Sequence, residues 1–300
     1  MNYSEVDTLR AGLTEVPPTA SELRRIRRVL FSRGVVVFGI IVILALIITA
    51  IFAPWIAPYD PYKMDLGKTF LQPCREHLLG TDALGRDVLS RLIFGTRIAL
   101  IVGVVAVGAA AALGMTMGLI AGYFGGWVSM IFMRFTDAIM AFPMILLALL
   151  IAGMLGGGLK NVILALTIAL MPSYARLMWG QVLSVKEGDY IGAARAIGAS
   201  DLRIMLRHIL PNCLPPLIVQ ITMMMGMAIL AEAALSFLGV GIKSPEAAWG
   251  TMIYEGYQYL RMHPILSLVP GLAIILVVFS FNMVGDGLRD ALDPRLRGIL

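Results

Sequence analysis

Long apolar runs separated by polar segments dominate the chain. The first covers residues 35–53 without a charged side chain, and later runs lie at about 98–122, 128–155, 162–178, 217–240 and 265–284. A helix of about 20 apolar residues crosses the hydrocarbon of a bilayer with its backbone groups hydrogen-bonded internally. The pattern therefore predicts an all-α membrane protein with six transmembrane helices.

The composition supports the same class. Of the 300 residues, 59% are hydrophobic and 14% are charged, and the mean hydropathy is +0.85. A soluble domain of this length is far less apolar. The net charge of +5 does not indicate a nucleic-acid partner, because the basic residues flank the apolar runs. We expect the lipid bilayer, and no nucleic acid, around this chain.

The Lys and Arg residues predict the orientation. Six spans place both termini on one side, and with cytoplasmic termini 15 of the 24 Lys and Arg residues lie inside, as the positive-inside rule requires. Arg86, Arg91 and Arg97 fall outside in a longer loop, where Asp82 and Asp87 accompany the first two. We therefore expect both termini in the cytoplasm.

This topology divides the chain into five parts. They are a basic cytoplasmic segment (1–34), a first transmembrane anchor (35–53), a periplasmic segment (54–97), a five-helix core (98–284) with a cytoplasmic loop at 186–216, and a cytoplasmic tail (285–300). We interpret the first run as a retained anchor, because Pro54 and Trp55 follow it in place of a signal-peptide cleavage site.

Three glycines form a stripe in the second apolar run. Gly114, Gly118 and Gly122 recur every four residues and so lie on one face of a helix. Small residues at this spacing let helices in a membrane pack closely. We expect the stripe to serve helix packing inside the subunit; a contact between two subunits is the alternative.

The polar loop at 186–216 is long enough to indicate a function. Ile191, Ala194 and Ile197 share one helical face, and Gly198 permits a tight bend after them. We expect a first short helix here that lies across the membrane surface. Small residues at its crest fit a groove on a partner protein.

A second short helix is expected after the bend. Ser200 is placed to cap its start, and Pro211 is expected to end it. The apolar residues between them repeat at helical spacing. The loop is therefore predicted to be a helix, turn, helix unit.

The same loop resembles a known motif. Ala193 and Ala194, then Gly198, then Ile209, Leu210 and Pro211 are similar to the so-called EAA loop of ATP-binding-cassette (ABC) importer permeases, which docks on the ATPase subunit. Two departures are visible. Gly192 replaces the usual glutamate, and the isoleucine lies one position late, with His208 in its place.

Other segments resemble one branch of that family, the permeases for dipeptides, oligopeptides, glutathione and nickel. The similar segments are residues 80–91, 235–239, 249–250 and 285–294. The resemblance implies a type I ABC importer permease fold in a bacterial inner membrane. It also implies ABC ATPase subunits, a second related permease and an extracytoplasmic solute-binding protein as partners. Peptides are the expected cargo; nickel, glutathione or another small solute is the alternative.

The chain itself offers no convincing nucleotide site. Gly67, Lys68 and Thr69 are similar to the end of a phosphate-binding loop, but Tyr62 stands where that loop needs glycine. We therefore expect no cofactor on this chain, with ATP and Mg²⁺ on the partner ATPase subunits. Neither catalytic nor metal-binding spacings are evident, so a transport subunit without enzymatic activity is expected.

Polar residues inside the apolar runs are candidates for the translocation path, because burying a charge in hydrocarbon is costly. Glu232 is the clearest, with Gln220 on the same helix. A hydrogen bond or ion pair between helices explains Glu232 equally well. Elsewhere, Arg134 and Asp137 are spaced for a local ion pair, and Arg176 is expected to snorkel to the cytoplasmic surface.

Two other classes of protein were weighed. An ion-coupled secondary transporter would show inverted repeats and several intramembrane acids, whereas this sequence has one prominent acid and no clear repeat. A membrane-embedded enzyme would need a catalytic constellation near the spans, and none is evident. The importer permease is the favoured interpretation.

Overall fold

The computed structural model describes residues 30, 31 and 33–292. Most of the expected N-terminal segment and part of the expected C-terminal tail therefore lie outside the described residues. The described chain is helical, and its one bridge of strand type joins Thr81 to Asp87.

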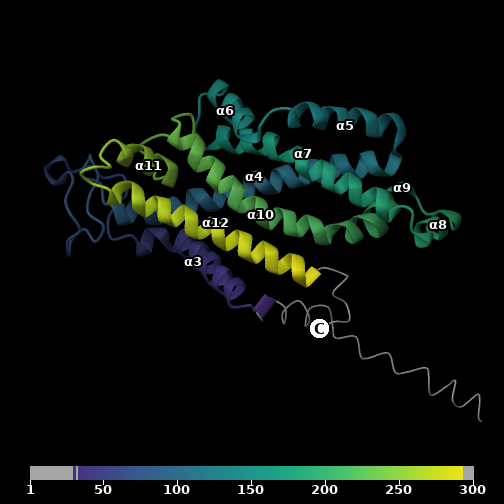
Figure 1. The fold of residues 1–300 in the computed structure, drawn as a ribbon, viewed down its shortest axis with the longest axis horizontal. Coiled ribbons are helices and arrows are strands. Elements are labelled where there is room, and N and C mark those ends of the chain that lie inside the picture. Colours follow the sequence, from purple (N-terminus) through teal and green to yellow (C-terminus); the bar gives the residue numbers. More distant parts are fainter. Residues whose placement is uncertain (1–29, 32, 293–300) are drawn as a thin grey trace, which may run out of the picture.

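The helices follow one another along a long bundle (Figure 1). The longer ones are α3 (Gly34–Ile56), α4 (Val88–Phe124), α5 (Gly126–Met140), α6 (Met144–Met154), α7 (Leu159–Val185), α10 (Leu210–Phe237) and α12 (Ile265–Leu292). Shorter elements are the 3-10 turn at Leu66–Lys68, α8 (Asp189–Ala196), α9 (Asp201–Arg203), the π-helical turn at Ile204–Ile209, and α11 (Trp249–Tyr257).

Five helices of the described chain are long and apolar enough to cross a membrane, and a sixth crossing exists if α5 and α6 form one broken span. This agrees with the predicted number of apolar spans. The five are α3, α4, α7, the continuous helix Asp201–Phe237, and α12.

The apolar run at 128–155 is not the single helix that we predicted. It breaks between Met140 and Met144, and α5 and α6 meet at an angle of 86°. Pro143 stands at the break. Proline lacks a backbone N–H and disfavours helical conformation in the preceding residue, so α5 ends before it.

The second predicted span also begins earlier than expected. Helix α4 starts at Val88, so the end of the segment at 54–97 is helical and not an extended loop. The Asp87 carboxylate accepts a hydrogen bond from the Ser90 backbone N–H, which caps the first turn. This cap therefore fixes the start of α4 before the predicted apolar run begins.

The glycine stripe of α4 lies against α7. A Cβ atom on Gly114 or Gly118 would overlap the backbone carbonyl oxygen of Met171 or Ala175, and one on Gly122 would lie 2.7 Å from Cβ of Val182. The two backbones therefore approach more closely than any side chain at these positions would permit.

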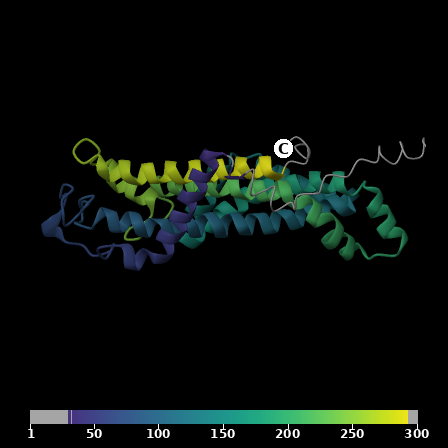
Figure 2. The ribbon, with the colours of Figure 1, turned by 90° about the horizontal axis from the view of Figure 1, so that it is seen from below.

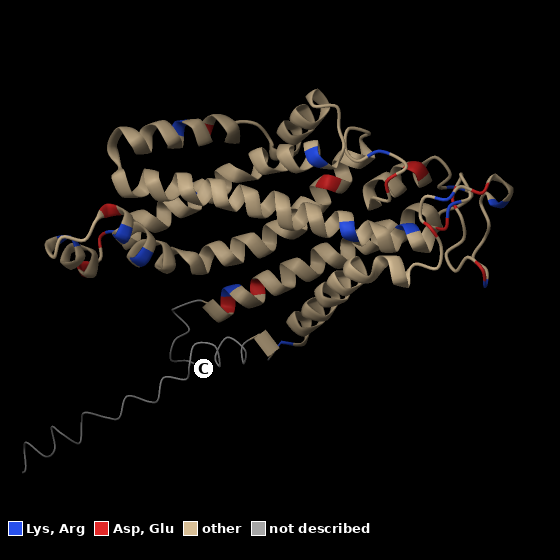
Figure 3. Cartoon of the chain, turned by 180° about the vertical axis from the view of Figure 1, so that it is seen from behind, with Lys and Arg blue, Asp and Glu red and all other residues tan. Residues whose placement is uncertain are grey.

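Polar and charged segments gather at the two ends of the bundle. Figure 2 shows the segment before α4 at one end and α8 at the opposite end. Figure 3 shows most charged residues at these ends and few along the helices between them. Near the described chain ends, Arg33 and Asp290 form an ion pair of 2.6 Å. The start of α3 and the end of α12 therefore lie close together.

Candidate functional site

The expected helix, turn, helix unit is present, but its second helix does not end at Pro211. After α8 the chain turns at Gly198, where φ is +80°, and then forms one continuous helix from Asp201 to Phe237. The π-helical turn at Ile204–Ile209 ends two residues before Pro211 and shifts the hydrogen-bond register. The helix therefore continues past a residue that has no N–H to donate.

The first helix of the unit presents small residues outward. Ile191 and Ala194 are buried, whereas Ile197 is 87% exposed because α8 ends at Ala196, just before it. The prediction that Ile197 shares one helical face with Ile191 and Ala194 was therefore wrong. Four neighbouring positions form an exposed surface that we call the crest: Gly192, Ala193, Ile197 and Gly198.

The three remaining residues of the motif lie at the base of the unit. Ile209 is fully buried, Leu210 is half-buried and Pro211 is exposed. Ile209 therefore packs the unit onto the bundle, whereas the crest is exposed.

The unit is fastened to the end of α4. The Tyr123 hydroxyl and Oδ1 of Asp201 share a hydrogen bond of 2.5 Å, and the Arg195 guanidinium lies 5.5 Å from the centre of the Tyr123 ring. Nζ of Lys186 donates to the Gly122 carbonyl oxygen at 3.1 Å. The sequence did not predict this role of Tyr123, because an aromatic residue near the end of an apolar run is typical of a membrane interface.

The two predicted path residues are not brought together. Glu232 is 2% exposed, and its Oε1 accepts a hydrogen bond of 2.7 Å from Oγ of Ser236. Gln220 lies 12 residues earlier on α10, about 18 Å away along the helix. It lines a cavity of about 550 Å³ between α7, α10 and α12, together with Gln181, Asn212 and Arg289.

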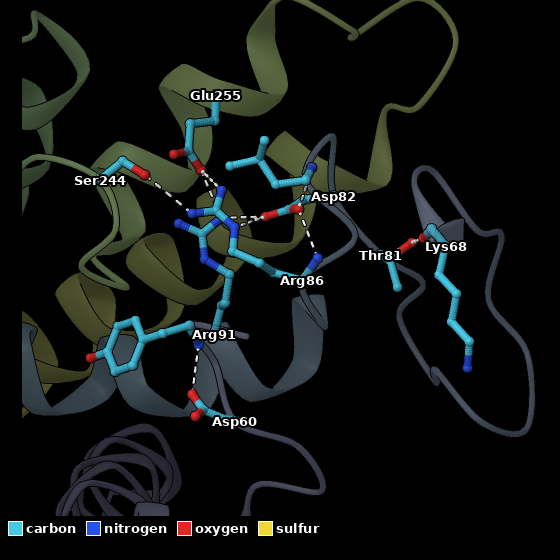
Figure 4. A network of polar contacts seen from close by, with 10 residues as sticks. Asp60, Lys68, Thr81, Asp82, Arg86, Arg91, Ser244 and Glu255 are labelled. Carbon is cyan, nitrogen blue, oxygen red and sulfur yellow. Dashed lines mark hydrogen bonds and ion pairs between the residues drawn. The ribbon is translucent and has the colours of Figure 1, made fainter. Parts of the chain in front are cut away.

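At the end of the bundle opposite the crest, a buried ion cluster contains Arg86 and Arg91 (Figure 4). The cluster explains two of the three arginines that the predicted topology places outside the cytoplasm. Oδ2 of Asp82 accepts from Nε of Arg86 at 2.7 Å and from Nη1 of Arg91 at 2.6 Å. Oε2 of Glu255, on α11, accepts from Arg86 at 2.8 Å and from Arg91 at 2.7 Å. Ser244 accepts a further bond from Arg86.

Both arginines are 1% exposed, so the cluster ties the start of α4 to α11 and the loop before it. Because two arginines meet two carboxylates, the cluster is formally neutral. Of the two acids that accompany the arginines in sequence, Asp82 joins the cluster and Asp87 contacts His77. Glu255 is 164 residues from Arg91, and no local pattern pairs them.

A second ion pair lies among the apolar helices. The carboxylate of Asp137, on α5, contacts the guanidinium of Arg176, on α7. The expected ion pair between Arg134 and Asp137 is also present, at 4.0 Å. The sequence did not predict this partner of Arg176, because it comes from another helix.

No group of three His, Cys, Asp or Glu side chains in residues 33–292 is arranged to hold a metal ion. The chemistry of the described chain is thus that of helix packing, ion pairing and an exposed crest. These features define an integral membrane protein with an exposed helix, turn, helix unit at one end of its bundle.

Comparison with known proteins identifies the family. Residues 114–298 match the family described as binding-protein-dependent transport system inner membrane component, and residues 21–73 match the N-terminal transmembrane domain of oligopeptide transport permease C. The chain belongs to the first of these families. It is a multi-pass inner-membrane permease subunit of an ABC importer.

Named relatives extend over nearly the whole chain. It is 42% identical over 284 residues to the dipeptide transport system permease protein DppC of Alkalihalophilus pseudofirmus, covering 95% of this chain and 92% of the relative. It is 44% identical over 276 residues to the glutathione transport system permease protein GsiD of Escherichia coli O6:K15:H31, covering 92% and 90%.

A solved structure is similar in fold. A chain of the inward-facing MetNI methionine ABC transporter aligns with a TM-score of 0.55 and 22% identity, covering 68% of this chain and 96% of that one. This likeness supports the type I importer permease fold.

Proposed function

We propose that this chain carries peptides across the bacterial inner membrane as one permease of an ATP-driven importer. The observation that supports this most is the similarity to the dipeptide and glutathione permeases over most of the chain. Glutathione is itself a small peptide, so both relatives point to one chemical class of cargo. The same proposal places both termini and the crest in the cytoplasm.

In this proposal the crest docks on a separate ABC ATPase, which holds ATP and Mg²⁺. Gly192 has no atom within 4 Å of the position of a Cβ, so its face is open to a partner. Movement of the docked unit passes to α4 through Tyr123 and Asp201, and to α10 because the helix from Asp201 to Phe237 is continuous. A second permease and an extracytoplasmic solute-binding protein complete the proposed importer.

The first experiment is affinity purification of the tagged chain from native membranes in mild detergent, with mass spectrometry and an ATPase assay. We expect an ABC ATPase and a second permease to be recovered, and peptide uptake to require ATP. Recovery of the chain alone, with uptake driven by an ion gradient, would contradict the importer and favour a secondary transporter.

A crest variant then tests the docking surface. Gly192→Arg adds a long charged side chain at an open position, and we expect it to abolish ATPase co-purification without reducing membrane insertion. Ser184→Arg adds the same charge at an exposed position near the end of α7, outside the crest, and should keep the complex. An intact complex in Gly192→Arg would refute docking at the crest.

A further inference from the structure

The ion pair between Asp137 and Arg176 lies well inside the membrane-crossing helices. Arg176 is nine residues before the end of α7, and Asp137 is 11 residues after the start of α5. At 1.5 Å per residue these positions are about 14 and 16 Å from those helix ends. Both side chains are nevertheless open to the surface of the single chain, with 50% exposure for Arg176 and 41% for Asp137.

A charged pair in this position does not suit a lipid-facing surface. Ionisable side chains at membrane depth face a bundle interior or a water-filled cavity, because hydrocarbon cannot solvate them. The outer face of α12 provides the contrast within this chain. There the exposed residues are apolar, with Leu268, Leu272 and Ile275 from 56% to 65% exposed.

The broken span gives a second, independent indication. Ala141, Phe142 and Pro143 interrupt the helix between α5 and α6, and all three are exposed. Irregular backbone at membrane depth is tolerated only where protein covers it or where it lines a water-filled cavity. The break begins four residues after Asp137, so both observations concern the same side of the molecule.

We infer that Asp137 and Arg176 line the solute path and hold the two charged ends of a peptide. The Arg176 guanidinium accommodates the terminal carboxylate, for which its planar fork of donors is suited. Asp137 accommodates the terminal ammonium group. This inference rests on the proposed function, because it assigns the peptide to that same path.

Charge balance favours this arrangement. In the empty path Asp137 and Arg176 pair with each other, while the more exposed Arg134 lies 4.0 Å from Asp137 and leaves the group with a net positive charge. A zwitterionic peptide that separates them offers each side chain a new partner of opposite charge, so no lone charge is left in a region of low polarity. A solute with only a cationic end would leave Arg176 without a partner, whereas Asp137 keeps Arg134 at 4.0 Å.

Charged thiol reagents test the surface without any transported cargo. Gly180→Cys places a thiol one turn after Arg176 on α7, at a position where a Cβ has no neighbour within 4 Å. The whole complex is used, with Cys74→Ser removing the exposed native thiol. We expect methanethiosulfonate reagents to label Gly180→Cys, and the anionic sulfonate to react several-fold faster than the cationic trimethylammonium reagent.

Two controls make this labelling decisive. In Gly180→Cys with Arg176→Gln the preference for the anionic reagent should disappear. Leu272→Cys, on the apolar face of α12, should react with neither reagent. If Gly180→Cys is as inert as Leu272→Cys, this face meets lipid or is covered by protein, and the inference fails.

Uptake of dialanine by the complete transporter tests the binding role. Arg176→Gln and Asp137→Asn should each lower uptake by about tenfold or more, because each removes a charged hydrogen-bonding partner, while membrane insertion and ATPase co-purification persist. The double variant Arg176→Asp with Asp137→Arg keeps an ion pair but reverses its orientation, and should not restore uptake.

Restored uptake in that double variant would show that the pair only braces α5 against α7, and would overturn the inference. A wild-type complex that takes up no peptide would instead refute the proposed function. The labelling preference at Gly180→Cys would still decide whether the ion pair faces an aqueous path.

Discussion

The Ser236 hydroxyl donates a hydrogen bond of 2.7 Å to Oε1 of Glu232, one turn earlier on α10. The same Oγ accepts a bond of 2.9 Å from the Ile242 backbone N–H. Both side chains are 2% exposed. An intramembrane acid is thus joined to the turn that follows its helix, and it does not face outward from the single subunit.

This geometry predicts that Glu232→Gln is tolerated. The amide carbonyl of glutamine can accept the Ser236 hydrogen bond as the carboxylate does, so assembly and uptake should remain close to wild type. Glu232→Leu removes the acceptor and should cost about 1–3 kcal/mol of stability. Thermal unfolding of the purified complex and an uptake assay measure both effects. Normal assembly with lost uptake in Glu232→Gln would instead support a role in the translocation path.

The buried ion cluster predicts a large effect of removing one partner. Glu255→Gln takes away a carboxylate shared by two arginines that are each 1% exposed. Breaking a buried pair leaves an uncompensated charge and costs about 3–5 kcal/mol; because Glu255 is itself 23% exposed, we expect the lower end. The apparent unfolding temperature of the complex should fall clearly.

Glu76→Gln is the matched control for that variant. Its ion pair with Lys68 is 3.3 Å long, and the two side chains are 71% and 45% exposed. Surface pairs of this kind contribute about 0–1 kcal/mol, so little change is expected. Equal unfolding temperatures for Glu255→Gln and wild type would show that the buried cluster does not stabilise this end of the bundle.

The glycine stripe predicts sensitivity to a single methyl group. Gly118→Ala brings Cβ into the backbone of α7 at Ala175 and should cost about 1–3 kcal/mol through overpacking. Gly108→Ala, on the same helix, places its Cβ where no atom lies within 4 Å and should be neutral or slightly stabilising. The yield and thermal stability of the detergent-purified complex distinguish the two. A neutral Gly118→Ala would mean that the helices separate easily at this level.

Tyr123→Phe tests the link from the docking unit to α4. The variant loses the hydrogen bond to Asp201 and keeps the ring beneath Arg195. We expect the ATPase to remain bound while the number of peptides carried per ATP hydrolysed falls. Measuring uptake and ATP hydrolysis in the same proteoliposomes gives this ratio. A parallel fall of both activities with an unchanged ratio would argue against transmission through Tyr123.

The sequence by itself determined the class of protein and the position of the helix, turn, helix unit. Apolar length predicts membrane crossing without any knowledge of packing, because a bilayer imposes the same requirement on every span. The first helix of the unit and the bend at Gly198 depend on residues close together in the chain, so local spacing predicted them; the exposure of Ile197 was not predicted. The order of motifs also pointed to the importer permeases.

Only the tertiary structure decided which charged groups meet. Arg91 finds Glu255 across 164 residues and Arg176 finds Asp137 across 39, and periodicity along one helix cannot specify a partner on another. The bend of 86° between α5 and α6 was hidden for a related reason. Pro143 permits a break in an apolar run, but packing against the neighbouring helices sets its direction, so the surface assigned here to the solute path could be recognised only after folding.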